Sequence, residues 1–154
     1  MQTPASIKGH PLHPILVTFP IGLWIFSLAA DIIYFARLNA GPWADIAFYT
    51  MAGGIAGALL AAVPGLIDLF SVSDPKLRRI GIIHMVLNLI VVALYCINWG
   101  LRFGQNRVPV GLFILNIISV ILLFVSGWLG GTLVHRYRMT VEEPGTARGP
   151  LTAT

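Results

Sequence analysis

The chain has 154 residues, of which 56% are hydrophobic and only 10% are charged, whereas about 25% of the residues in an ordinary soluble domain are charged. With a mean hydropathy of +0.82, this composition excludes a typical soluble domain and indicates an integral membrane protein. The formal charge of +4 does not indicate a nucleic-acid-binding protein, because the cations lie at the ends of apolar segments rather than on one basic face.

Four apolar segments are each long enough to cross a hydrocarbon core as a helix, which takes about 20 residues. They cover residues 14–36, 43–70, 80–101 and 108–134, and turn-forming residues separate them. Ser73 or Asp74 before Pro75 is typical of a helix start. We therefore expect an all-α, four-helix transmembrane bundle over residues 1–139 and a flexible cytoplasmic tail over residues 140–154.

The distribution of lysine and arginine predicts the orientation in the membrane. In an antiparallel bundle, three cations lie on one side: Arg37, Arg102 and Arg107. Seven lie on the side that holds both termini: Lys8, Lys76, Arg78, Arg79, Arg136, Arg138 and Arg148. Cytoplasmic segments carry the excess of positive charge, so we expect both termini on the cytoplasmic side.

Small residues at four-residue spacing predict close helix contacts in lipid. The second segment carries Gly53, Gly57, Ala61 and Gly65, and the fourth carries Gly127 and Gly131. The lone Cys96 lies inside an apolar segment and cannot form an intrachain disulfide, so we expect it to serve packing.

All four histidines are expected at the cytoplasmic face: His10, His13, His84 and His135. Asp68 ends the second segment at the same face. His84 lies within an apolar span, where an ionisable side chain needs a partner or a ligand. Asn88 follows it on the same helix face. Tyr95 and Asn98 continue this polar stripe, which should point into the bundle. Asp31 is deeper in the first segment and has no evident cation partner, so its role stays open.

The histidines allow two cofactor hypotheses and one without a cofactor. In the first, a b-type haem is bound by His84 on one side and by His13 on the other. His10 and His135 are the less favoured alternatives to His13. Its propionates would pair with cations at the same face: Lys8, Arg78, Arg79 and Arg136. In the second, one transition-metal ion is bound by His10, His13, His84 and Asp68. In the third, His84 donates a hydrogen bond to a neighbouring carbonyl or to Asp68, and the other three histidines are interfacial residues without a ligand.

Several segments resemble a family of bacterial membrane proteins known as domain of unknown function 2231. The opening Gly-His-Pro-Leu-His-Pro motif at residues 9–14 is the most specific of them, and the others are residues 62–69, 79–84 and 127–134. His10, His13, Asp68, His84 and Asn88 fall on motif positions of the family. His135 departs from the pattern, which argues against a ligand role for it.

The resemblance implies a multi-pass protein of the bacterial inner membrane. Some relatives carry a fused Rieske-type iron-sulfur domain, which implies electron transfer and favours haem over a bare metal ion. We therefore predict a haem-binding electron-transfer accessory protein with His84, His13, His10 and Asn88 at the cofactor. It has no catalytic residues of its own, and a redox partner protein would exchange electrons with it.

The alternative is a non-catalytic structural or assembly subunit of a larger membrane complex, with the glycine faces as its working surface. Either protein could form a homo-oligomer in the bilayer. A transporter or channel is disfavoured, because the segments show no inverted repeat and no charged pathway across the span.

Overall fold

The computed structural model describes residues 4–8, 10–38, 41–105 and 107–137. Two short antiparallel strands, β1 (Ser6–Ile7) and β2 (His10–Pro11), precede the helices. The helices are α1 (Leu12–Leu16), α2 (Thr18–Ala36), α3 (Trp43–Ser71), α4 (Pro75–Leu101) and α5 (Val110–Tyr137). α1 leads into α2 with one residue between them, so the two act as a single span.

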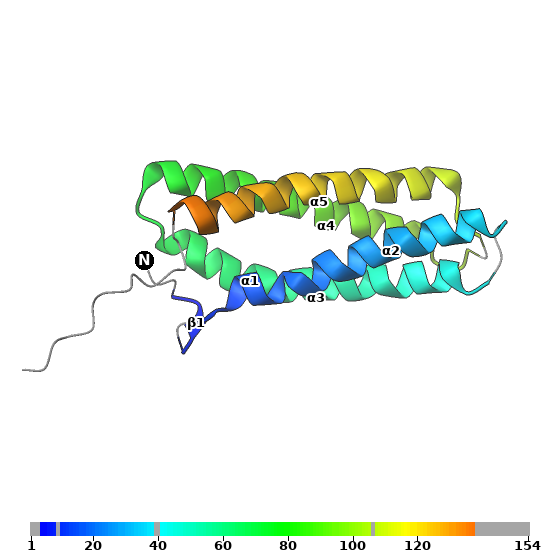
Figure 1. Cartoon of the computed structure of the whole chain (residues 1–154), viewed down its shortest axis with the longest axis horizontal. Coiled ribbons are helices and arrows are strands. Elements are labelled where there is room, and N and C mark those ends of the chain that lie inside the picture. The colour runs from blue at the N-terminus through cyan, green and yellow to red at the C-terminus, as the bar shows by residue number, and fades with distance from the viewer. Residues whose placement is uncertain (1–3, 9, 39–40, 106, 138–154) are drawn as a thin grey trace, which may run out of the picture.

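The fold is a bundle of four long helices, each long and apolar enough to cross a membrane. α1 and α2 pack against α3 in one antiparallel hairpin, and α4 packs against α5 in the other. α3–α4 and α2–α5 contacts join the two hairpins (Figure 1). The all-α membrane bundle predicted from the sequence is therefore confirmed.

The described ends of the chain lie at the same end of the bundle, together with the α3–α4 connection (Figure 1). We call this the histidine end, and the end with the α2–α3 and α4–α5 connections the arginine end. Which end faces the cytoplasm remains a prediction. The tail predicted for residues 140–154 lies outside the described residues.

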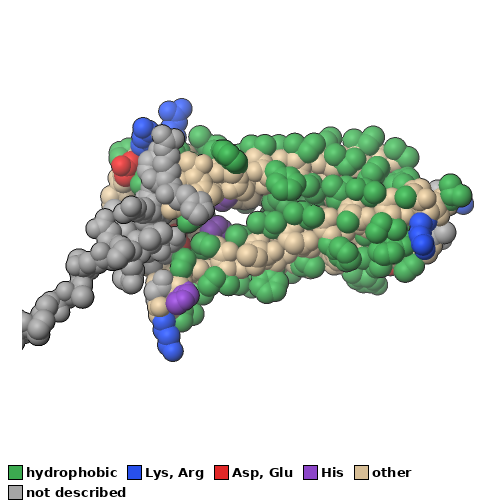
Figure 2. Space-filling view, viewed as in Figure 1, with side chains coloured by type: hydrophobic (Ala, Val, Ile, Leu, Met, Phe, Trp, Pro, Cys, Tyr) green, Lys and Arg blue, Asp and Glu red, His purple; other side chains and the backbone are tan. Residues whose placement is uncertain are grey.

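Large apolar side chains cover the outside of the bundle, and lysines and arginines are confined to its two ends (Figure 2). The buried positions instead include small and polar residues such as Ser27, Asn98, Asn116 and Ser119. Lipid solvates apolar side chains well, so polar groups are the ones that gain most from facing inward. The distribution is that of a bundle surrounded by hydrocarbon.

α4 begins where the sequence indicates. The Asp74 carboxylate accepts hydrogen bonds from the amides of Lys76 (2.7 Å) and Leu77 (3.1 Å), and Pro75 occupies the first turn. These bonds satisfy two of the amides that a helix start leaves without partners. The predicted helix start at Asp74 is confirmed, and α4 begins five residues before the apolar segment.

The glycine face of α3 packs against α2 as predicted. A methyl group built on Gly53 or Gly57 would lie 3.2 Å from Leu23 or Pro20, and at Gly54 it would collide with the Trp24 indole. The prediction for α5 is wrong, because a methyl group on Gly127 or Gly131 would meet no atom of another helix within 4 Å among the residues that the structure describes. On α5 it is Gly130 that lies in close contact with another helix, against the His84 ring of α4.

Candidate cofactor site

His13 and His84 face each other at the histidine end, although they belong to different hairpins. Their ring centres are 6.3 Å apart and the ring planes are nearly perpendicular, at 87°. Histidine side chains lie beside a hollow between the two hairpins (Figure 2). The structure thus brings together the two residues that the sequence placed first in a haem site.

His13 is held by two residues of α3. Its Nδ1 donates a hydrogen bond to the Ala61 carbonyl oxygen at 2.8 Å. Its ring lies against Gly65, where a methyl group would come within 2.7 Å of Nδ1. Because Gly65 has no side chain, the ring reaches the helix backbone and the carbonyl one turn earlier. The glycine therefore makes space for an imidazole rather than for another helix.

His84 is held in the same way by α5. Its Nδ1 donates to the Ser126 carbonyl oxygen at 2.9 Å, and the Ser126 hydroxyl lies 3.1 Å from the same nitrogen. A methyl group on Gly130 would lie 2.9 Å from Cε1 of the ring. On its own helix, the Asn88 amide donates to His84 Nε2 at 3.0 Å. In this arrangement Nδ1 is the donor of the His84 ring and Nε2 is its acceptor.

The two histidines share one chemical arrangement. In each, Nδ1–H donates to a backbone carbonyl, which fixes the ring and leaves the lone pair on Nε2. Metal-ligating histidines almost always donate their other ring N–H to a carbonyl or carboxylate in this way. The pair is therefore preset in the tautomer that ligates through Nε2.

Two further residues predicted for the site, His10 and Asp68, form hydrogen bonds with the backbone of the N-terminal segment. His10 is exposed on β2 and donates from Nδ1 to the Lys8 carbonyl at 3.0 Å. Asp68 is buried and accepts a hydrogen bond from the Ala5 amide at 3.0 Å. Among the described residues no group of three or more His, Cys, Asp or Glu side chains could hold a metal ion. The His135 side chain lies outside the described residues.

A second polar cluster lies near the arginine end and includes a partner that the sequence analysis missed. Asp31 and Arg102 form two hydrogen bonds of 2.7 Å, from Nη1 to Oδ1 and from Nη2 to Oδ2. Both side chains are almost completely buried. The sequence pattern instead predicts Arg102 among the cations at the membrane surface. The signal was available, because Arg102 directly follows the third apolar segment and Asp31 lies near the same end of the first.

Two asparagines complete this cluster. Asn116 donates to Asp31 Oδ2 at 2.7 Å and accepts from the Tyr95 hydroxyl at 2.9 Å. Asn98 accepts from Nε of Arg102 at 2.8 Å and donates to the Leu112 carbonyl at 2.9 Å. The prediction that Tyr95 and Asn98 point into the bundle is confirmed. The cluster joins α2, α4 and α5, and its members satisfy one another without a ligand.

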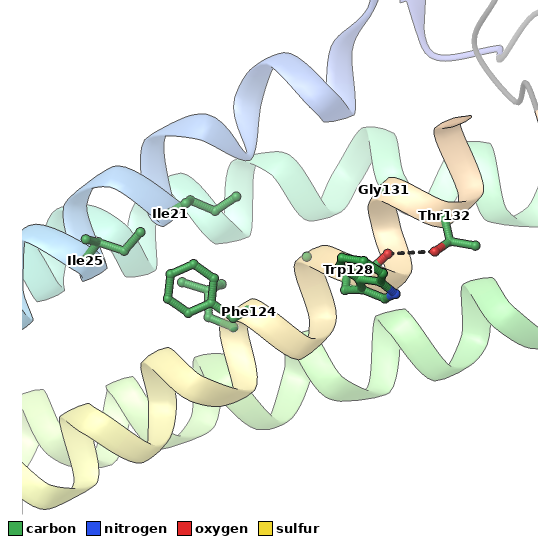
Figure 3. A pocket seen from close by; sticks show the side chains of 8 residues that line it. Ile21, Ile25, Phe124, Trp128, Gly131 and Thr132 are labelled. Atoms are coloured by element: carbon green, nitrogen blue, oxygen red, sulfur yellow. Dashed lines mark hydrogen bonds between the residues drawn. The ribbon is translucent and has the colours of Figure 1, made fainter. Parts of the chain in front are cut away.

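A groove of about 630 Å³ runs between α2 and α5 (Figure 3). Its lining is mostly apolar: Ile21, Ile25, Leu123, Phe124, Gly127, Trp128, Gly131 and Thr132. The Thr132 hydroxyl donates to the Trp128 carbonyl of its own helix at 2.9 Å. Among the described residues that line the groove there is no histidine or carboxylate, so these residues offer no such ligand to a metal.

The family described as "Predicted membrane protein (DUF2231)" matches residues 9–143. This match covers most of the chain, and it includes His10, His13, Asp68, His84 and Asn88. Comparison with curated proteins and with solved structures gives no match.

Proposed function

The chain belongs to the DUF2231 family of predicted membrane proteins, and we propose that it binds one b-type haem between His13 and His84 and serves electron transfer. The observation that carries the proposal is the histidine pair itself. Two imidazoles from opposite hairpins have ring centres 6.3 Å apart, and each is fixed through Nδ1 to a backbone carbonyl.

The separation of the rings fits two axial ligands. Metal–imidazole bonds are about 2.0–2.1 Å long, so rings on opposite sides of one ion have centres roughly 6 Å apart. Both histidines are presented by facing elements of a helix bundle, as in other bundle cofactor sites. The observed distance between the ring centres therefore agrees with the distance expected for two histidines that bind one ion. This distance is determined by how the two hairpins pack together.

The number of ligands favours haem over a bare metal ion. Zinc and similar ions in proteins usually take at least three side-chain ligands, and the described residues bring only two histidines together. A porphyrin brings four nitrogens of its own, so two histidines would be enough to hold its iron. The proposal therefore keeps His13 and His84 as ligands and does not include His10 or Asp68.

The positive charges at the histidine end would suit the negatively charged propionates of haem. Lys8, Arg78 and Arg79 are exposed there, and cations of this kind form strong hydrogen bonds with carboxylates such as haem propionates. Haem supplies one-electron transfer, while the chain supplies the ligands, the orientation and the apolar surroundings. We place the protein in the bacterial inner membrane with the histidine end toward the cytoplasm, where a separate redox protein would exchange electrons with it.

The test is an absorption spectrum of detergent-purified protein from haem-supplemented cells, before and after dithionite reduction. We expect a sharp Soret band and a sharp reduced α band at one haem per chain, both lost in His13→Ala and His84→Ala. His10→Ala is the matched control, because His10 lies on the same segment but is exposed and bonds only locally. A featureless spectrum of the unmodified protein would overturn the proposal.

One observation favours a second candidate, a structural subunit of a larger membrane complex. Both Nδ1 donors are satisfied by backbone carbonyls, and Asn88 already donates to Nε2 of His84. Each histidine bonds within its own hairpin, so both could act as packing residues alone. In that case His84→Ala would lower thermal stability, and the purified protein would contain neither haem nor metal.

A further inference from the structure

One face of α3 holds the N-terminal segment at three successive points. The Ala61 carbonyl accepts a hydrogen bond from the His13 ring, and the missing side chain of Gly65 leaves space for that ring. Asp68 accepts a hydrogen bond from the amide of Ala5. These positions are separated by about one helical turn each, so they form one stripe. The stripe runs from the carbonyl beneath the imidazole to the end of the helix.

Asp68 is the anchor at the end of this stripe. Its Oδ1 accepts the Ala5 amide hydrogen at 3.0 Å, and both residues are 8% exposed. A carboxylate that accepts a backbone N–H forms one of the stronger hydrogen bonds in proteins. Asp68 therefore fixes a backbone that precedes it by 63 positions.

The anchored residue in turn fixes the start of α1. The Ala5 carbonyl accepts a hydrogen bond from the Leu12 amide at 3.0 Å. This bond closes a loop that contains the β1–β2 pair. Leu12 is the first residue of α1 and directly precedes His13. Two consecutive hydrogen bonds thus connect the Asp68 carboxylate to the backbone that carries the imidazole.

We propose that Asp68 is a positioning residue: it latches residues 4–12 onto the end of α3 and thereby sets where His13 lies relative to His84. In the sequence, Asp68 was a candidate metal ligand. In the structure its carboxylate binds a backbone amide, and no metal-binding group is found among the described side chains. The consequence for haem ligation rests on the function proposed above, whereas the latch itself does not.

The test compares two substitutions at Asp68. Asp68→Ala removes the acceptor, while Asp68→Asn keeps an oxygen that can accept the same N–H. Ser71→Ala is the matched control, because its hydroxyl lies at the same helix end but donates to the Asp68 carbonyl. Ala5→Pro removes the donor instead and serves as an independent variant if Asp68→Ala does not fold.

The first measurement is amide hydrogen exchange over residues 4–12 in detergent. Exchange should be at least about tenfold faster in Asp68→Ala and in Ala5→Pro, because a buried hydrogen bond to a charged group is lost. It should be unchanged in Ser71→Ala, and in Asp68→Asn it should increase by much less than in Asp68→Ala, because the acceptor remains but loses its charge. Unchanged exchange in the Ala and Pro variants would overturn the latch.

The second measurement is nitrogen-15 NMR of histidine-labelled, dithionite-reduced protein, which reports the tautomer of each ring with or without bound haem. In Asp68→Ala the His13 signal should lose its single Nδ1–H form, while the signal of His84, which α5 holds, should remain. An unchanged His13 signal despite fast exchange would overturn the positioning role. If the unmodified protein binds no haem, the proposed function fails, but these two measurements still decide the role of Asp68.

Discussion

The Asp31 carboxylate and the Arg102 guanidinium form a two-bond ion pair between α2 and the residue that follows α4, with both hydrogen bonds 2.7 Å long. Neither side chain is appreciably exposed. Asn116 and Asn98 bind the remaining polar atoms of the pair, so α2, α4 and α5 meet through charge-assisted hydrogen bonds. This arrangement fixes the arginine end, while at the histidine end the two hairpins meet through His13 and His84.

Removal of Arg102 should strongly destabilise the bundle. Arg102→Ala leaves a buried carboxylate without its cation, and loss of one partner of a buried ion pair costs about 3–5 kcal/mol. The free energy of unfolding in detergent, measured by denaturant titration, checks this value. The double variant Asp31→Leu with Arg102→Met should recover much of the loss, because no unpaired charge remains. A double variant less stable than Arg102→Ala would contradict this account.

Asn116 should contribute more to the free energy of unfolding than its size suggests, because it forms hydrogen bonds with both Asp31 of the ion pair and Tyr95. Asn116→Ala removes a donor to Asp31 and an acceptor for the Tyr95 hydroxyl, and we expect a loss of about 2–4 kcal/mol. Ser119→Ala is the control, since Ser119 is equally buried on α5 but donates to the Leu115 carbonyl of its own helix. Equal losses in the two variants would show that the bridge does not contribute specifically.

The sequence was sufficient to predict the four spans and their polar inward face, because hydropathy and helical periodicity are local properties. It also placed His13 and His84 at the same end. It did not predict the partner of Asp31, because the pairing depends on how the first and third spans, which are not neighbours in the bundle, are placed across it. Which glycine of α5 contacts another helix depends on how α5 is rotated about its axis. The four-residue spacing in the sequence predicts Gly127 for this contact, whereas in the structure Gly130 packs against α4.

Gly54 should be the least tolerant glycine at the contact of α2 with α3. A methyl group there would overlap the Trp24 indole, which stacks on Tyr95 with 4.3 Å between ring centres and donates to the Met51 carbonyl. Gly54→Ala should cost about 1–3 kcal/mol through overpacking and shift the tryptophan fluorescence. Gly100→Ala, where a methyl group meets nothing within 4 Å, should leave stability equal or slightly higher.

Under the haem hypothesis, Asn88 competes with the iron for His84. Its amide donates to His84 Nε2, the nitrogen that would bind iron, so it must release this nitrogen before ligation. Asn88→Ala removes a competing hydrogen bond of about 1 kcal/mol, and we expect about fivefold tighter haem binding in a titration of haem-free protein. The haem-free variant should be less stable than the unmodified protein. Weaker haem binding would instead indicate that Asn88 helps to hold the cofactor.

Gly130 and Gly127 allow the site to be probed on a single helix. A side chain at Gly130 meets the His84 ring at 2.9 Å from Cε1, whereas one at Gly127 meets no atom within 4 Å. Gly130→Val should therefore displace His84 from the Ser126 carbonyl and lower the haem content severalfold, with helical content retained by circular dichroism. Gly127→Ala should bind one haem per chain, because its methyl group faces the open groove between α2 and α5 rather than the histidines. The ratio of Soret to protein absorbance in the two variants measures the difference. Full haem content in Gly130→Val would mean that the backbone of α5 does not set the position of His84, and the case for a preset ligand pair would then rest on His13 alone.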